Sequence, residues 1–144
     1  MKKTFSFFIL LYFILSNVSK AGSPWGEGEL QLSDNAANWF IQFVKGKGRK
    51  SPADFYVTID GANATYWYCA EGRCKPGSPS EDIKHCERQF NKKCKKFAFK
   101  RTVKWKNGIN PAKGKASTFN SKWSEQEILA KLTELGFYQN NLIS

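Results

Sequence analysis

Apolar residues at helical spacing predict a first helix over residues 34–45. Ser33 is a residue type that caps helix N-termini, and Gly46 follows the segment at a position suited to a C-cap. The apolar positions are Ala36, Ala37, Phe40, Ile41 and Val44, and Trp39 and Phe43 widen the stripe. A stripe of this kind predicts a helix that packs one face against a core.

Two further helices carry capping signals in their first turns. Ser78-Pro79-Ser80-Glu81 places a cap, a proline at the first helical position and a capping-box acid before residues 79–90. Ser124 and Glu127 repeat the capping box before a C-terminal helix within residues 124–138. Its apolar face is formed by Ile128, Leu129, Leu132 and Leu135, and Gly136 is placed to end the helix, with Phe137 folding back against it.

Alternating apolar and polar residues predict three strands. Phe55, Val57 and Ile59 alternate with polar positions, and Asp60-Gly61 supplies turn residues before a second run that ends at Cys69. This predicts a β-hairpin of residues 54–59 with residues 64–69. A third strand is predicted from Lys95 to Trp105, with Phe97, Phe99, Val103 and Trp105 on the inner face and Lys96, Lys100 and Lys104 on the outer face. Arg101 interrupts the inner alternation and indicates a bulge or an edge.

These elements predict an α+β fold in the order helix, strand, strand, helix, strand, helix. We expect a small three-stranded, mainly antiparallel sheet with helices on one face, stabilised by disulfides. Residues 22–107 would form this core domain. Residues 108–123 lack periodicity and are interpreted as a basic linker or wrapping segment, followed by the capped helix within residues 124–138.

Residues 1–21 have the features of a secretory signal peptide. Lys2 and Lys3 precede an apolar run of about 11 residues, and Ser19-Lys20-Ala21 supplies small residues for cleavage before Gly22. The apolar run is short for a membrane-spanning helix, although an uncleaved N-terminal anchor is the alternative. We therefore expect a bacterial protein of the periplasm or the exterior, without a transmembrane span once the signal is removed.

Four cysteines after a secretory leader favour two disulfides. Cys69, Cys74, Cys86 and Cys94 follow the spacing C-x4-C-x11-C-x7-C. The local pairing, Cys69–Cys74 with Cys86–Cys94, fits the predicted elements best, and the crossed pairing Cys69–Cys94 with Cys74–Cys86 stays open. A zinc site is the rival interpretation, but the chain has no CxxC pair. We predict no metal and no cofactor.

The chain is basic, with a formal net charge of +11. Removing Lys2, Lys3 and Lys20 with the leader leaves 20 basic residues against 12 acidic ones, a net charge of +8. Such a charge favours anionic partners. The longest acid-free basic run, from Asn91 to Ser124, contains eleven Lys or Arg residues. The candidate anion-binding residues are Lys96, Lys100, Arg101, Lys104, Lys106 and Trp105.

The basic run, one glycine-rich loop and the only histidine each have an interpretation without a ligand or a reaction. Lysines on a strand also keep an edge soluble, so the basic run need not bind anything. The segment Lys45-Gly-Lys-Gly-Arg-Lys50 has the composition of a phosphate-binding loop without its GxxxxGK[ST] pattern, and we interpret it as a solvated loop. His85, the only histidine, has Asp82 nearby in sequence but no recognisable nucleophile, and no catalytic residue is predicted.

The cysteine spacing and the strand that follows it resemble a known class of domains. The C-x4-C spacing, the helix carrying Cys86, the segment Cys94-Lys95-Lys96-Phe97-Ala98 and the strand end Lys104-Trp105-Lys106-Asn107 resemble a class of small secreted domains of proteobacteria. The resemblance covers about residues 33–107. The class carries no known activity, so the resemblance implies a disulfide-stabilised domain and transfers no active site.

The sequence thus favours a non-enzymatic periplasmic or secreted binding module. Its basic surface would meet an anionic glycan, a lipid head group or another anionic component of the cell envelope. A structural or accessory subunit of an envelope protein complex is the main alternative, and a metal-binding or hydrolytic protein is the third. The secretory leader disfavours nucleic acid as the routine ligand.

Overall fold

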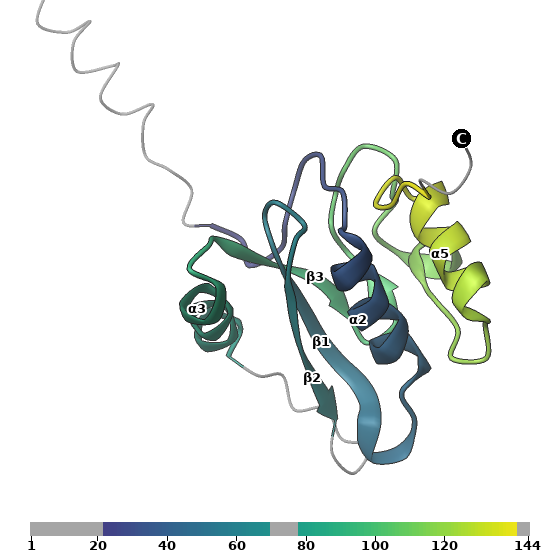
Figure 1. Ribbon diagram of the computed structural model, residues 1–144, viewed down its shortest axis with the longest axis horizontal. Coiled ribbons are helices and arrows are strands. Elements are labelled where there is room, and N and C mark those ends of the chain that lie inside the picture. Colours follow the sequence, from purple (N-terminus) through teal and green to yellow (C-terminus); the bar gives the residue numbers. More distant parts are fainter. Residues whose placement is uncertain (1–21, 70–77, 141–144) are drawn as a thin grey trace, which may run out of the picture.

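The structure of the protein is a computed structural model, and it describes residues 22–69 and 78–140 (Figure 1). The predicted signal peptide, residues 1–21, lies outside these residues. The elements, in chain order, are α2 (Asp34–Lys45), η1 (Gly48–Lys50), β1 (Ser51–Thr58), β2 (Ala64–Cys69), α3 (Pro79–Phe90), β3 (Cys94–Phe99), β4 (Thr102–Val103), α4 (Gly114–Ser117) and α5 (Glu125–Glu134). The α+β class is confirmed.

The sheet has four strands in the order β2-β1-β3-β4, all paired antiparallel. The prediction of three strands is wrong, because the segment predicted as one strand turns back at Lys100 and Arg101. Lys100 adopts a left-handed conformation, with φ of 52°, and its amide donates to the Ala53 carbonyl at 2.7 Å. Neither Gly nor Asn marks this turn in the sequence, so local turn chemistry did not reveal it.

The predicted hairpin of β1 and β2 is confirmed. Val57 pairs with Ala64 and Phe55 pairs with Tyr66, across the turn that contains Asp60 and Gly61. The Asp60 carboxylate accepts hydrogen bonds from the Ala62 amide and the Thr58 hydroxyl, and it pairs with Lys92 at 2.8 Å. The contact with Lys92, followed by the hydrogen bonds from Thr58 and Ala62, holds the pKa of Asp60 well below its usual range.

Helices cover both faces of the sheet, whereas the sequence predicted helices on one face (Figure 1). Side chains of α2 and α5 share the main core with Phe55 and Val57 of β1. On the opposite face, Cys86 of α3 packs with Tyr56 of β1 and Cys94 of β3. Strand β1 is therefore buried on both sides, a condition that simple alternation does not report.

The C-terminal part of the chain belongs to the same core as α2. The α5 residues Ile128 and Leu132 are fully buried there, and Phe137 folds back beside them. The predicted capping box at Ser124 and Glu127 is present in α5. The predicted linker, residues 108–123, contains α4 and contributes Phe119 to the core. Tertiary contacts hold this segment against the domain, and its sequence shows no hydrophobic periodicity that would have predicted them.

Helix α2 begins at Ser33 as predicted, and the Ser33 hydroxyl accepts a hydrogen bond from the Ala36 amide at 3.0 Å. Helix α3 has Ser78 at its N-cap and Pro79 in its first turn, also as predicted. The predicted capping hydrogen bond is absent there, because the Ser78 hydroxyl is bonded to the Ser80 hydroxyl instead. The helix start is thus set by Pro79 and by the fold around it.

The disulfide Cys86–Cys94 joins α3 to the start of β3. This confirms one bridge of the local pairing and excludes the crossed pairing, which required Cys86 to join Cys74. The second predicted bridge involves Cys74, which lies outside the described residues. Disulfides persist in oxidising compartments, so the Cys86–Cys94 bridge is compatible with a secreted or periplasmic location. Within the described ranges, no helix is long and apolar enough to cross a membrane.

The N-terminal arm, residues 22–30, is held against the sheet by backbone pairing. Trp25 forms a parallel bridge with Lys96, and Glu27 forms one with Lys106. Between them, Gly26 lies directly against the indole of Trp105, which donates a hydrogen bond to the Gly28 carbonyl at 2.9 Å. The arm thus covers Trp105, which is 2% exposed.

We predict that Gly26→Ala destabilises the protein by about 1–3 kcal/mol, the usual cost of overfilling a packed contact. A Cβ at this position would overlap the Trp105 ring. The measurement is the free energy of unfolding from urea titration, with Gly22→Ala as control because a Cβ there meets only the flexible end of Lys95. Equal stability of both variants would contradict the packing described.

Candidate functional site

Lys96, predicted to face solvent, is instead buried between the sheet and the arm. Its ammonium lies 2.5 Å from the Asp54 carboxylate, and the two side chains are 10% and 8% exposed. The ammonium also lies 4.8 Å from the Trp25 ring and 5.2 Å from the Phe99 ring. The expectation of an outward Lys96 is wrong because Trp25 of the arm and the rings of Tyr56 and Phe99 enclose its ammonium on that face of the sheet.

The buried charge pair continues into a polar contact with α3. Tyr56 lies opposite Lys96 in the sheet, and its hydroxyl donates to the Asp82 carboxylate at 3.1 Å. Burial, followed by the negative charges of Asp54 and Asp82, raises the pKa of Tyr56 well above its ordinary value. The phenol therefore stays protonated and acts as a hydrogen-bond donor. This arrangement links β1, β3 and α3. Lys96 is paired with Asp54 and Tyr56 with Asp82, so these side chains serve the fold.

Two other candidates have structural contacts. Trp105 is buried beneath the arm, so its ring is not available for stacking on a ligand. The Arg101 guanidinium donates to the carbonyls of Val44 and Gly46 at 2.8 and 2.7 Å, at the C-terminal end of α2. Burial lowers the pKa of Arg101. Its charge nevertheless suits the negative end of the helix dipole.

The remaining candidates, Lys100, Lys104 and Lys106, are at least partly exposed. Lys104 and Lys106 line a small cleft of about 210 Å³ beside Trp25, and the Lys104 ammonium is 5.7 Å from that ring. Glu27 lies in the same cleft. The structure thus brings Lys104 and Lys106 together at this cleft, with Glu27 also in the lining, and places Lys96 against the same Trp25 ring.

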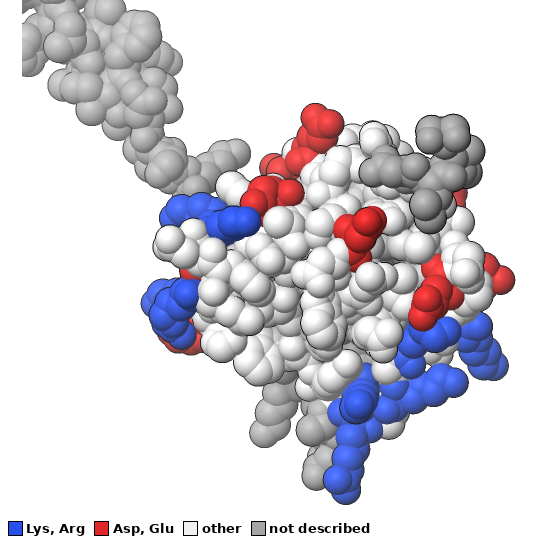
Figure 2. All heavy atoms as spheres, viewed as in Figure 1, with Lys and Arg blue, Asp and Glu red and all other residues white. Residues whose placement is uncertain are grey.

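A denser group of cations lies at the C-terminal end of α2, in the segment interpreted from sequence as a solvated loop. Lys45 donates to the Trp123 carbonyl at 2.8 Å, which brings the segment before α5 next to this end of the helix. Figure 2 shows Lys and Arg gathered at this corner of the molecule. We call it the basic corner, and it consists of the exposed residues Lys45, Lys47, Arg49, Lys50 and Lys122.

The ion pairs that the structure describes involve other lysines, so the cations of the basic corner carry no paired carboxylate within the described chain. Sequence reasoning missed this site because Lys122 is remote from residues 45–50 in the chain. The available signal was four cations within six residues, from Lys45 to Lys50.

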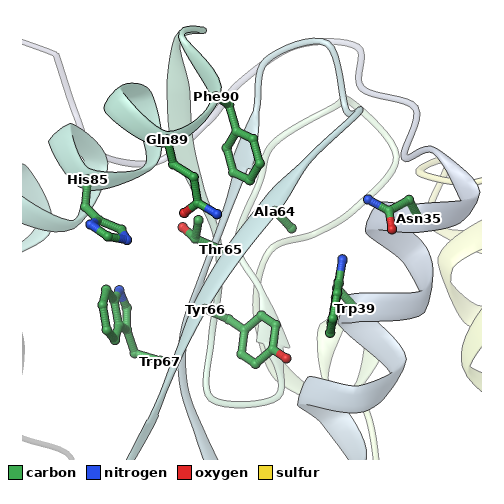
Figure 3. A pocket seen from close by; sticks show the side chains of 9 residues that line it. All are labelled: Asn35, Trp39, Ala64, Thr65, Tyr66, Trp67, His85, Gln89 and Phe90. Carbon is green, nitrogen blue, oxygen red and sulfur yellow. The ribbon is translucent and has the colours of Figure 1, made fainter.

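A second surface, the aromatic groove, lies along the edge strand β2 between α2 and α3 (Figure 3). Its volume is about 410 Å³. Strand alternation directs Tyr66 toward α2, where it contacts Trp39 with ring centroids 5.9 Å apart, and Trp67 toward α3, where it contacts His85 at 5.5 Å. The groove is lined by Asn35, Trp39, Ala64, Thr65, Tyr66, Trp67, His85, Gln89 and Phe90.

Sequence reasoning did not identify the aromatic groove. Trp39 was assigned to the apolar stripe of the first helix, yet it is 44% exposed, and Trp67 is 41% exposed. Burial and hydrogen bonding to Tyr68 raise the pKa of Tyr66 to about 12, so it is neutral. The available signal was the density of aromatic residues from Tyr66 to Tyr68.

His85 lies in this groove and has an aromatic neighbour, Trp67. Within the described ranges, no three His, Cys, Asp or Glu side chains are grouped so as to hold a metal ion. No protein-family model, curated protein or solved structure matches the chain.

We predict that Lys96→Met destabilises the protein by about 3–5 kcal/mol, because it leaves the buried Asp54 carboxylate without its partner. The double variant Asp54→Asn with Lys96→Met should recover part of this loss, since it buries no unpaired charge. Urea denaturation measures both. Lys92→Met serves as control and should cost about 0–1 kcal/mol, because its pair with Asp60 is exposed. A loss no larger than that of the control would contradict the burial of this charge.

Proposed function

We propose that the protein is a non-enzymatic binding module of the periplasm or the cell exterior, and that the basic corner recognises an anionic component of the cell envelope. The observation that carries the proposal is the convergence of Lys47, Arg49, Lys50 and Lys122 at the end of α2. Because these side chains lack intramolecular carboxylate partners within the described residues, their charge is available to a ligand.

The geometry of the corner suits an extended anionic surface. Arg101 already donates to the carbonyls of Val44 and Gly46 at the end of α2, and so offsets the negative end of the helix dipole, while Lys45 donates to the Trp123 carbonyl. The outer cations are therefore not needed for that purpose. They extend from an exposed loop that can adapt to phosphates of lipid head groups or to sulfates and carboxylates of a glycan.

The test compares two triple variants that remove the same charge from different places. Lys47→Gln/Arg49→Gln/Lys50→Gln removes three of the five cations of the basic corner, and Lys104→Gln/Lys106→Gln/Lys113→Gln removes three cations elsewhere that are at least partly exposed. Each cation near an anionic membrane is worth about 1 kcal/mol, so the first variant should bind vesicles containing phosphatidylglycerol on the order of a hundredfold more weakly. The second variant should lose much less. Heparin resin in parallel distinguishes a glycan from a lipid source.

Salt provides the second readout. Raising ionic strength from about 0.1 M to about 1 M shortens the Debye length from about 10 to about 3 Å, so binding through the basic corner should be abolished. Equal losses in the two triple variants, or binding that persists at high salt, would refute the proposal. The latter result would favour an accessory subunit that packs on an envelope protein.

A further inference from the structure

We propose that the aromatic groove is a carbohydrate site that takes a chain of uncharged pyranose rings, with the indoles of Trp39 and Trp67 as its two stacking platforms. This inference is independent of the basic corner. The two indoles come from α2 and β2 and lie on either side of the strand edge, so the groove passes over the edge of the sheet (Figure 3).

The first observation is that both indoles are exposed, although most described aromatic side chains of this protein are packed in or against its core. Trp39 and Trp67 are more than 40% exposed, yet each is supported by a second ring, Tyr66 or His85. An aromatic side chain supported in this way presents a rigid, flat face with negative π-electron density. The C–H groups on one face of a pyranose ring carry partial positive charge and complement such a surface.

The second observation is the set of polar groups in the groove. Asn35 and Gln89 are exposed amides, each with a donor group and an acceptor group. The Thr65 hydroxyl is buried and, among the described residues, has no hydrogen-bond partner, which is a costly state for a polar group. Sugar hydroxyls both donate and accept, so movement of the exposed Gln89 side chain would allow one of them to satisfy Thr65.

The third observation is charge. None of the nine described lining residues is Asp, Glu, Lys or Arg. This distinguishes the groove from the basic corner and favours a neutral ligand. A groove whose two platforms stand apart and open to solvent suits consecutive rings of a chain better than a single sugar. An extended peptide paired with β2 is the competing occupant, because β2 has a neighbouring strand on one side only within the described sheet.

The experiment measures binding of neutral oligosaccharides by isothermal titration calorimetry, with cellohexaose, maltohexaose and N-acetylchitohexaose as probes, each beside its disaccharide. We expect at least one hexaose to bind, more tightly than its disaccharide. Trp39→Ala and Trp67→Ala should each lower its affinity about tenfold, as expected for loss of a stacked aromatic contact. Ile59→Ala is the matched control, since Ile59 is an exposed apolar residue outside the groove, and it should bind as the parent does.

Thr65→Val separates a binding role from a structural one. Replacing a buried hydroxyl that has no partner with a methyl group should leave the unfolding temperature unchanged or raised, while oligosaccharide affinity falls. The Lys47→Gln/Arg49→Gln/Lys50→Gln variant should retain oligosaccharide binding at low and high salt, so failure of the basic-corner proposal is distinguishable from failure of this one.

Absence of binding to all three hexaoses overturns the carbohydrate assignment. So does equal affinity in Trp39→Ala, Trp67→Ala and Ile59→Ala, provided that circular dichroism shows all three to be folded. Capture from a library of extended peptides, with loss of binding on N-methylation of the peptide backbone and no oligosaccharide binding, would assign the groove to strand addition instead.

Discussion

The burial of one positive charge, that of Lys96, constrains most of this fold. Its ammonium requires the Asp54 carboxylate, so two neighbouring strands must hold these side chains together, and Trp25 and Phe99 complete the enclosure. The arm supplies Trp25 and is itself fixed by Gly26 against Trp105. Because a buried ion pair is expensive unless its geometry is satisfied, the arm, β1 and β3 must be formed together.

Covering both faces of the sheet determines where ligands can bind. The central strands β1 and β3 are almost wholly enclosed by α2, α5, α3 and the arm. Among the described residues, the edge at β2 and the loops at the helix ends stay accessible. The aromatic groove and the basic corner occupy these places, one neutral and one cationic. They suit different chemical features of a ligand.

Capping residues and hydrophobic periodicity predicted most helices and strands, but the basic run did not predict which cations are exposed. Ser33 and Ser124 cap helices as their positions indicated, and the β1–β2 hairpin has the expected partners. The turn at Lys100 escaped prediction because its left-handed conformation is held by the Ala53 carbonyl, a contact remote in sequence. Among the candidate anion-binding residues, Lys96 and Trp105 proved buried and Arg101 proved bonded to α2, since lysine or tryptophan in a strand does not report what covers it.

The sequence by itself determined the α+β class, the starts of α2 and α5, and the spacing that allows Cys86 to meet Cys94, because each depends on residues close together in the chain. Only the tertiary structure decided that α3 lies on the face opposite α2, and that Lys122 joins the cations of residues 45–50. It also decided that Trp39 and Trp67 frame one groove. These outcomes depend on the register of the sheet and on which face each helix covers, quantities that no local period encodes.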